Sequence, residues 1–454
     1  MTSTEVHDYA TATAGGLADA LAERSVSSAE LVETAIARIE RLDGAINAVV
    51  VRDFDRARAA ADDADAAIAR GERRPLLGVP MTVKEAHNVA GLPTTWGIGE
   101  AKTFIAAEDS VGVARLKAAG ALILGKTNVP PHLGDWQSVN PIYGRTNHPL
   151  DASRTPGGSS GGGAAALAAG MTPLEFGSDI GGSIRVPASF CGVFGHKPSW
   201  GVIPERGHTP PGFDGVDTPL GVIGPMARTA ADLALALDVL AGPAGDEAKG
   251  YSLALPAPRH ERLADYRVLI IDRHPVAKVD REISAALETL AANLAKAGVT
   301  VARQSNLLPD LEQAHGIYWT LLTAVMSRGM PELAEPIGAH AWMTALDSQL
   351  AVRRRWAALF EDYDVVIAPT FGVVAFPHDD SPQAARVHVI DGETTPYLSQ
   401  IAWPGMATLA NLPATAVPIA KTRTGLPIGA QVIGPYLEDR TTIAFAGLVE
   451  REFG

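Results

Sequence analysis

The spacing of apolar residues in the first 70 positions predicts helices. A serine and a glutamate three residues apart, Ser27 and Glu30, form a capping pair, and apolar residues then recur at helical intervals up to Asp43-Gly44, where we expect the helix to end. The Ala-rich stretch 53–70 carries charges along its length and predicts a second amphipathic helix. We therefore expect residues 1–70 to wrap the core without contributing to chemistry.

Short apolar runs then alternate with further helical stretches. The runs that predict buried strands are 76–84, 121–124, 266–272, 299–302 and 364–370. The stretches that predict helices are 229–240, 280–297 and most of 311–361. Strand–helix–strand order is typical of an α/β fold. Because no repeat or low-complexity linker interrupts the chain, we expect residues 1–454 to form one domain.

Composition and charge narrow the class of protein. Of the 454 residues, 46% are hydrophobic, which is enough for a large core, and the net charge of −13 argues against nucleic acid as a main partner. The single cysteine, Cys191, excludes an internal disulfide framework and a Cys-rich metal site, and its apolar surroundings favour a core position. We see no signal peptide and no apolar run of the ~20 residues that a membrane span needs, so we expect a cytoplasmic protein without a membrane partner.

Two clusters of glycine and serine stand out from this pattern. Residues 156–163 and 177–187 flank a short Ala-rich segment. Glycines in such numbers mark sharp bends or close approaches of the backbone. A flexible linker is the alternative, but Ile180, Ile184 and Val186 are interleaved with the second cluster and indicate burial. We expect two loops whose N–H groups and serine oxygens face one pocket.

The run from Gly157 to Pro198 resembles the amidase signature family of hydrolases, which use a Ser–cis-Ser–Lys triad. It contains Gly-Gly-Ser-Ser-Gly-Gly, then Gly-Ser-Asp-Ile-Gly-Gly-Ser-Ile-Arg, with Ser159 and Ser183 24 positions apart as the family has them. Among its members the chain looks most like aryl acylamidases and metagenomic urethanases. The resemblance implies a mixed, twisted β-sheet covered by helices on both faces, with residues 76–200 as the catalytic core segment.

The resemblance also assigns roles to individual residues. Ser183 would be the nucleophile, Ser159 the proton relay, reached through a cis peptide after Gly158, and Lys84 the base, followed by Glu85 where the family usually has Asp. A lysine acts as a base only when burial without a carboxylate partner keeps it neutral. The expected oxyanion hole consists of the backbone N–H groups of Ile180, Gly181, Gly182 and Ser183. The expected supporting residues are Gly158, Ser160, Asp179 and Arg185. No metal or cofactor is required.

Three further segments carry weaker signals. Residues 120–127 match the P-loop pattern, but their middle is a buried strand and prolines follow, so we do not expect nucleotide binding. The polar-aromatic pair Trp136 and Gln137 contacts either substrate or the core. The Pro/Gly-rich loop 201–220 is a candidate active-site loop, and its Arg206 and His208 either touch a ligand or are solvated.

These observations predict a hydrolase of carbon–nitrogen bonds in amides and in carbamates (urethanes), acting through an acyl-enzyme on small apolar or aryl substrates. Two alternatives stay open. The family signature is shared with the glutaminase subunit of tRNA-dependent amidotransferases, and a catalytically dead scaffold would be a binding protein. The sequence does not distinguish a monomer from a homodimer.

Overall fold

The computed structural model describes residues 9–213, 215–328 and 334–454. Residues 1–8 of the expected N-terminal wrap, residue 214 of the expected loop and residues 329–333 of an expected helical stretch lie outside them. The described part is built on one 11-stranded mixed sheet. The strands, in sheet order, are β1 (Val49–Arg52), β3 (Leu122–Thr127), β2 (Pro80–Lys84), β6 (Leu174–Asp179), β8 (Val222–Ala227), β7 (Phe194–Lys197), β14 (Ala414–Lys421), β15 (Pro427–Ile433), β11 (Val365–Pro369), β9 (Arg267–Ile270) and β10 (Thr300–Ala302).

Parallel pairing is confined to two regions of this sheet. Strand β2 runs parallel to β3 and β6, and β9 runs parallel to β10 and β11, whereas the other pairs are antiparallel. Two small hairpins stand apart from the sheet: β4 (Val139–Asn140) with β5 (Gly144–Arg145), and β12 (Val387–Ile390) with β13 (Glu393–Pro396).

Helices cover both faces of the sheet. They are α1 (Ala14–Ala22), α2 (Ser28–Ile46), α3 (Phe54–Ala69), α4 (Val111–Ala118), α5 (Gly161–Ala168), α6 (Arg185–Cys191), α7 (Ala230–Leu240), α8 (Glu247–Gly250), α9 (Arg281–Lys296), α10 (Leu311–Met326), α11 (Ala339–Asp362), α12 (Ala402–Leu409) and α13 (Asp439–Phe453). In β9, Val268 and Ile270 belong to a core cluster with α7, α9 and α13, whereas Leu269 belongs to another with α10, α11 and α12. Since successive strand residues point to opposite faces, helices pack on each face. The expected fold class is confirmed.

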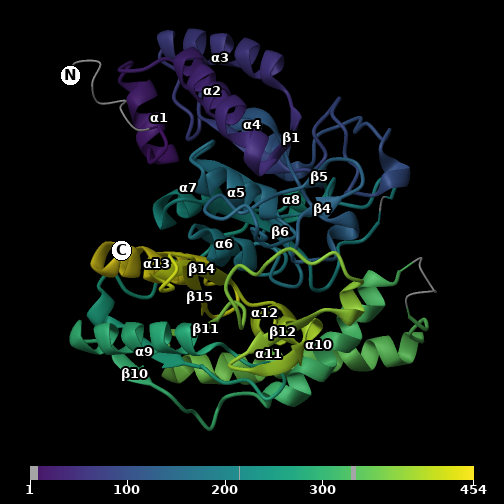
Figure 1. The fold of residues 1–454 in the computed structure, drawn as a ribbon. Coiled ribbons are helices and arrows are strands. Elements are labelled where there is room, and N and C mark those ends of the chain that lie inside the picture. The colour runs from purple at the N-terminus through teal and green to yellow at the C-terminus, as the bar shows by residue number, and fades with distance from the viewer. Residues whose placement is uncertain (1–8, 214, 329–333) are drawn as a thin grey trace.

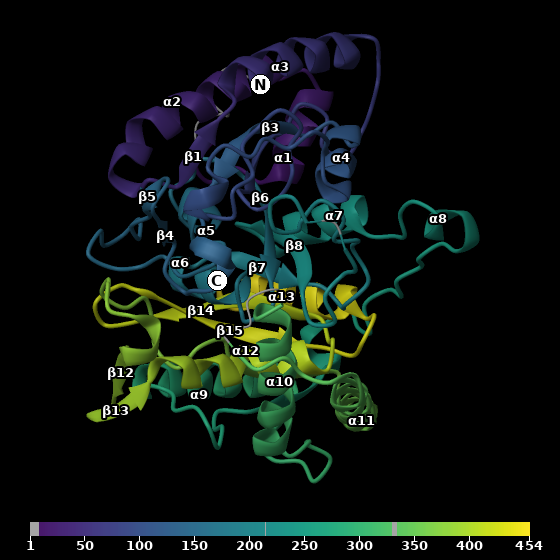
Figure 2. The same ribbon diagram turned by 90° about the vertical axis from the view of Figure 1, so that its right-hand side faces the viewer.

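The N-terminal helices lie at one end of the molecule, and α9, α10 and α11 lie at the other (Figures 1 and 2). The capping box of Ser27 and Glu30 is present in α2. The expected end of that helix at Asp43-Gly44 is wrong, because the helix continues to Ile46 and ends at Asn47 in the left-handed conformation. The carboxylate of Asp43 accepts hydrogen bonds from the N–H groups of Ala48 and Val49, so this aspartate fixes the chain that leaves the helix.

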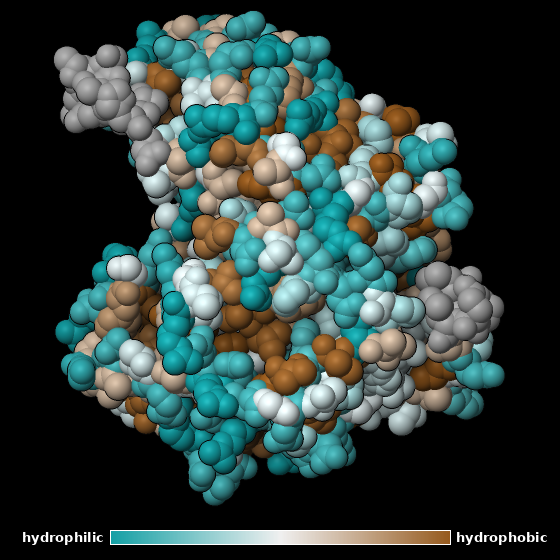
Figure 3. Space-filling view, in the orientation of Figure 1, coloured by the Kyte–Doolittle hydropathy of each residue, from teal (hydrophilic) through white to brown (hydrophobic). Residues whose placement is uncertain are grey.

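The sheet places the carboxyl ends of two strands that carry expected site residues next to each other. Strand β2 ends at Lys84, and its parallel neighbour β6 ends at Asp179. Carboxyl ends of parallel strands lie side by side, which is where α/β proteins place their sites. The P-loop-like segment is part of strand β3, which runs through Lys126 and Thr127, so the expectation of a strand there is confirmed. In Figure 3 hydrophobic residues gather near the middle of the molecular face that is shown there.

Candidate active site

The amino group of Lys84 lies between two serine hydroxyls. Its Nζ is 2.6 Å from Ser159 Oγ and 2.9 Å from Ser178 Oγ. Lys84 is completely buried and Ser159 is 1% exposed, so bulk water does not compete for these contacts. The arrangement links an amine to a hydroxyl through a hydrogen bond along which a proton can move.

Burial sets the protonation state of this lysine. Loss of solvation, only partly opposed by the charges of Asp179 and Glu175, lowers the pKa of Lys84 to about 7. Neither carboxyl group forms an ion pair with Lys84 in the part of the chain that the structure describes. Asp179 pairs with Arg185, and Glu175 accepts hydrogen bonds from Thr82 and from Thr127. A neutral amine is therefore available near pH 7.

Ser183 faces a cavity of about 330 Å³ together with Ser159 and Ser178. The two serine-bearing segments are joined at this point, because the N–H of Ser160 donates to the carbonyl oxygen of Ser183 at 3.0 Å. The structure thus places the expected nucleophile and relay at one cavity, and the expected base in contact with the relay, although the three residues lie in separate segments of the sequence.

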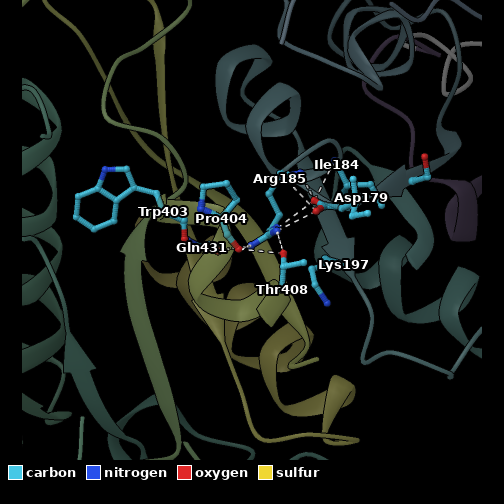
Figure 4. A network of polar contacts seen from close by, with 12 residues as sticks. Asp179, Ile184, Arg185, Lys197, Trp403, Pro404, Thr408 and Gln431 are labelled. Carbon is cyan, nitrogen blue, oxygen red and sulfur yellow. Dashed lines mark hydrogen bonds and ion pairs between the residues drawn. The ribbon is translucent and has the colours of Figure 1, made fainter. Parts of the chain in front are cut away.

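Asp179 and Arg185 hold the loop that carries Ser183. The guanidinium bonds to both carboxylate oxygens and continues to Thr408 Oγ1 and Gln431 Oε1, at 2.9 and 2.6 Å (Figure 4). Burial alone would raise the pKa of the Asp179 carboxyl, but Arg185 lowers it to about 2. The carboxylate also accepts the N–H groups of Gly182 and Ile184, at 2.9 and 3.1 Å. The two residues therefore brace the loop from its inner side.

Two backbone carbonyl groups of this loop accept hydrogen bonds from aromatic side chains. Tyr318 donates its hydroxyl to the Ile180 carbonyl at 2.7 Å, and Trp136 donates its indole N–H to the Gly181 carbonyl at 3.0 Å. The N–H of Gly182, one of the four expected oxyanion donors, already donates to Asp179. The N–H groups of Ile180, Gly181 and Ser183 have no acceptor within the described residues, and these three groups are the ones available to an oxyanion.

Close packing explains the glycine before the relay serine. A Cβ atom on Gly158 would lie 2.3 Å from the carbonyl oxygen of Asp135, and the Gly158–Ser159 peptide bond is cis. Ser160, the next residue, has its Oγ 3.4 Å from both the N–H and the carbonyl of Ser178. Gly158 therefore packs against the backbone of Asp135, and Ser160 lies against Ser178.

The four expected substrate contacts separate into one that lines the cavity and three that do not. His208 lines the cavity with Ser183. Trp136 is buried beneath the loop, Gln137 forms two hydrogen bonds with the backbone of Asp379, and Arg206 is exposed to solvent away from the cavity.

Several lining residues were not expected from the sequence. Ser178, the second contact of Lys84, is inside the motif, so its position could have suggested it. Glu205 and Phe213 belong to the loop 201–220, which the sequence marks as a candidate active-site loop. Trp96, Leu133 and Met326 come from distant segments and have no local signal. Most of these side chains are apolar, and burial together with the nearby Asp217 raises the pKa of the Glu205 carboxyl to about 8.

Two further properties bear on partners. Within the described residues, no group of three or more His, Cys, Asp or Glu side chains is placed to hold a metal ion. No helix among those same residues combines the length and the apolar character needed to cross a membrane.

Comparison with known proteins gives matches along nearly the whole chain. The family described as Amidase matches residues 30–336 and 321–443. The protein named "Putative amidase AmiB2" of Mycobacterium bovis is 34% identical over 468 residues, which cover 98% of this chain and 96% of that protein. A glutamyl-tRNA(Gln) amidotransferase chain of Roseiflexus castenholzii is 32% identical over 480 residues, which cover 95% of this chain and 94% of that one.

Solved structures share the fold. A chain from an inhibitor-bound vestigial complex that reveals the origins of an s-triazine catabolic enzyme has a TM-score of 0.84 and 30% identity, covering 97% of this chain and 98% of that one. A bacterial aryl acylamidase of the amidase signature family has a TM-score of 0.80 over 97% of this chain and 96% of its own, and at 24% identity this likeness concerns the fold alone.

Proposed function

The chain belongs to the amidase family, whose amidase-signature enzymes hydrolyse carbon–nitrogen bonds of amides, and from this premise we propose that Lys84, Ser159 and Ser183 are its catalytic triad. The observation that carries the proposal is the 2.6 Å contact between Lys84 Nζ and Ser159 Oγ beside a cavity that Ser183 also lines. The lowered pKa of Lys84 supports the role of base.

The proposed reaction moves one proton along this row of groups. Ser183 Oγ attacks the carbonyl carbon, its proton passes to Ser159 Oγ, and the proton of Ser159 passes to Lys84 Nζ. The N–H groups of Ile180, Gly181 and Ser183 stabilise the oxyanion; losing one such donor typically costs ~3 kcal/mol of transition-state stabilisation. The proton then returns through Ser159 to the leaving amine, and water releases the acyl group from Ser183 by the same route.

We propose small apolar or aryl amides, and carbamates with the same groups, as substrates. Trp96, Leu133, Phe213 and Met326 give the cavity a largely apolar wall, which suits an aryl group. A carbamate offers the same carbonyl to Ser183, so the triad accommodates both bonds. We retain the cytoplasm as the expected location and a small molecule as the expected partner.

The test is release of one aniline from its acetanilide and from its carbamate analogue. Wild type should release it from at least one substrate, and Ser183→Ala should lose both activities by several orders of magnitude. The ratio of the two wild-type rates then ranks amide against carbamate. Unchanged hydrolysis by Ser183→Ala would reject the proposed nucleophile and favour a binding protein in a contaminated preparation.

A second candidate, the glutaminase component of an amidotransferase, is favoured by one observation. The amidotransferase relative from Roseiflexus castenholzii matches 95% of this chain at 32% identity. Such a component would hydrolyse glutamine only with its partner chains, whereas the apolar cavity favours an independent amidase. Glutamine hydrolysis that appears only after partner chains are added, with no anilide cleavage, would support this second candidate.

A further inference from the structure

His208 is held in the wall of the cavity by two other aromatic rings. Its ring centroid lies 4.7 Å from that of His87 and 5.1 Å from that of Trp96. Its backbone N–H donates to the carbonyl of Glu205 at 2.7 Å. These contacts fix an imidazole in the wall of the same cavity that Ser183 lines.

One nitrogen of this ring has no hydrogen-bond partner among the described residues. This nitrogen is Nε2 of His208. The atom is buried, and the residue as a whole is only 9% exposed, so solvent does not readily supply the missing partner. Buried polar atoms in folded proteins nearly always have a partner. Because His208 lines the cavity, a bound ligand is the group that can supply it.

The chemistry of the ring defines what that group must be. Burial, and to a smaller extent the charge of Lys84, lowers the pKa of His208 to about 3, so the ring is neutral. A neutral imidazole carries its proton on one ring nitrogen and a lone pair on the other. With the proton on Nδ1, the unpaired Nε2 carries the lone pair and can accept a hydrogen bond.

We propose that His208 Nε2 accepts a hydrogen bond from the N–H beside the scissile carbonyl, and thereby selects secondary amides and carbamates of primary amines over their N-alkyl counterparts. The inference rests on the proposed function. An anilide has this N–H as its one strong donor, and His208 lines the same cavity as Ser183.

Two carboxyl groups that line the cavity are already engaged. The carboxylate of Asp179 accepts hydrogen bonds from Arg185 and from the loop backbone. Glu205 accepts the N–H of Thr218 at 3.4 Å and, with its raised pKa, is mostly protonated at neutral pH. Asp217 and His132 also line the cavity but are exposed to solvent, whereas His208 offers a buried, unpaired nitrogen to a substrate N–H.

The kinetic test compares acetanilide with N-methylacetanilide in wild type, His208→Phe and His208→Gln. His208→Phe should lower kcat/KM for acetanilide about tenfold and leave N-methylacetanilide unchanged, because only the first substrate loses a hydrogen bond. His208→Gln keeps an acceptor oxygen and should retain most of the selectivity. Equal losses on both substrates in His208→Phe, with thermal unfolding unchanged, would overturn the proposal.

A binding measurement keeps this result separate from the triad. In Ser183→Ala, calorimetric titration should show tighter binding of acetanilide than of N-methylacetanilide, and the preference should disappear in the double variant with His208→Phe. If wild type cleaves neither the anilides nor the carbamate analogue, the proposed function fails, and this titration alone still decides the role of His208. If the double variant still binds acetanilide more tightly than N-methylacetanilide, the proposed role of His208 is rejected.

Discussion

Arg185 and Asp179 form an ion pair in which neither side chain has any exposed surface. The pair lies immediately behind the loop of Ser183, and its carboxylate also holds the N–H groups of Gly182 and Ile184. Water cannot replace either partner at this depth, so stability and the shape of the oxyanion site depend on the same contact.

Replacing Arg185 by alanine should therefore reduce both the stability of the protein and its catalytic rate. We expect a loss of about 3–5 kcal/mol in the free energy of unfolding, because an uncompensated carboxylate remains buried, and a large fall in kcat. Urea unfolding and anilide turnover measure the two effects. The matched control is Arg262→Ala, whose ion pair with Asp265 is largely exposed and should contribute little to stability. Similar losses in both variants would contradict this account of the buried pair.

The pH profile of catalysis should report the protonation of Lys84. With a pKa of about 7, its amine is neutral above that pH and gains a proton below it. Acid protonates the base, so kcat/KM should fall about fivefold from pH 7 to pH 6 and about tenfold for each further pH unit. Steady-state kinetics between pH 5.5 and 9 provide the measurement. A profile that stays flat from pH 6 to 8 would exclude this lysine as the base.

Removing the same lysine should stabilise the protein while abolishing catalysis. Its pKa falls from 10.5 in the unfolded chain to about 7 in the native state, so between these values the unfolded state binds one more proton, and stability rises with pH. Lys84→Met lacks this cost and should melt at a higher temperature than wild type, most clearly at or below pH 7.

The control for that variant is Lys249→Met, since Lys249 is mostly exposed beside Asp246. It should leave the melting temperature nearly unchanged at every pH. A lower melting temperature for Lys84→Met at pH 7 would mean that its contacts with Ser159 and Ser178 outweigh the burial of the amine.

Two helical glycines should respond in opposite ways to alanine. In α5, a Cβ atom on Gly163 would lie 2.4 Å from Glu175 Cγ, and the Glu175 carboxyl is held by Thr82 and Thr127. Gly163→Ala should therefore destabilise the protein by roughly 1–3 kcal/mol through overpacking. In α10, Gly316 has nothing within 4 Å of the same position, so Gly316→Ala should stabilise by about 1 kcal/mol. Thermal unfolding of both variants tests the pair, and changes of the same sign would contradict it.

Local patterns predict the parts of this molecule that depend on local chemistry. The capping box of α2, the strand that ends at Lys84 and the two serine-bearing loops follow from short-range rules about caps, periodicity and glycine. The two clusters of glycine and serine also predict that serine oxygens from both loops face one pocket, and Ser159 and Ser183 line the same cavity.

Contacts between distant segments could not be predicted in this way. Tyr318 reaches the Ile180 carbonyl from 138 positions away, and nothing around it in the sequence distinguishes it from other core tyrosines. Two residues of one loop, Arg206 and His208, end in solvent and in the cavity respectively, because the fold of an irregular loop has no fixed period. The sequence does not separate two roles for Trp136, since packing beneath a loop and lining a cavity require the same side chain.

The reach of Arg185 has a consequence for how this protein could be divided or recombined. Its guanidinium bonds to Pro404 O, Thr408 and Gln431, all supplied by the last quarter of the chain. A fragment ending near residue 245 would contain all three proposed triad residues and still leave these bonds unmade. We therefore expect the segment that carries the proposed triad to fold correctly only together with the last quarter of the chain. Chimeras between relatives should work best when both of these parts come from the same parent.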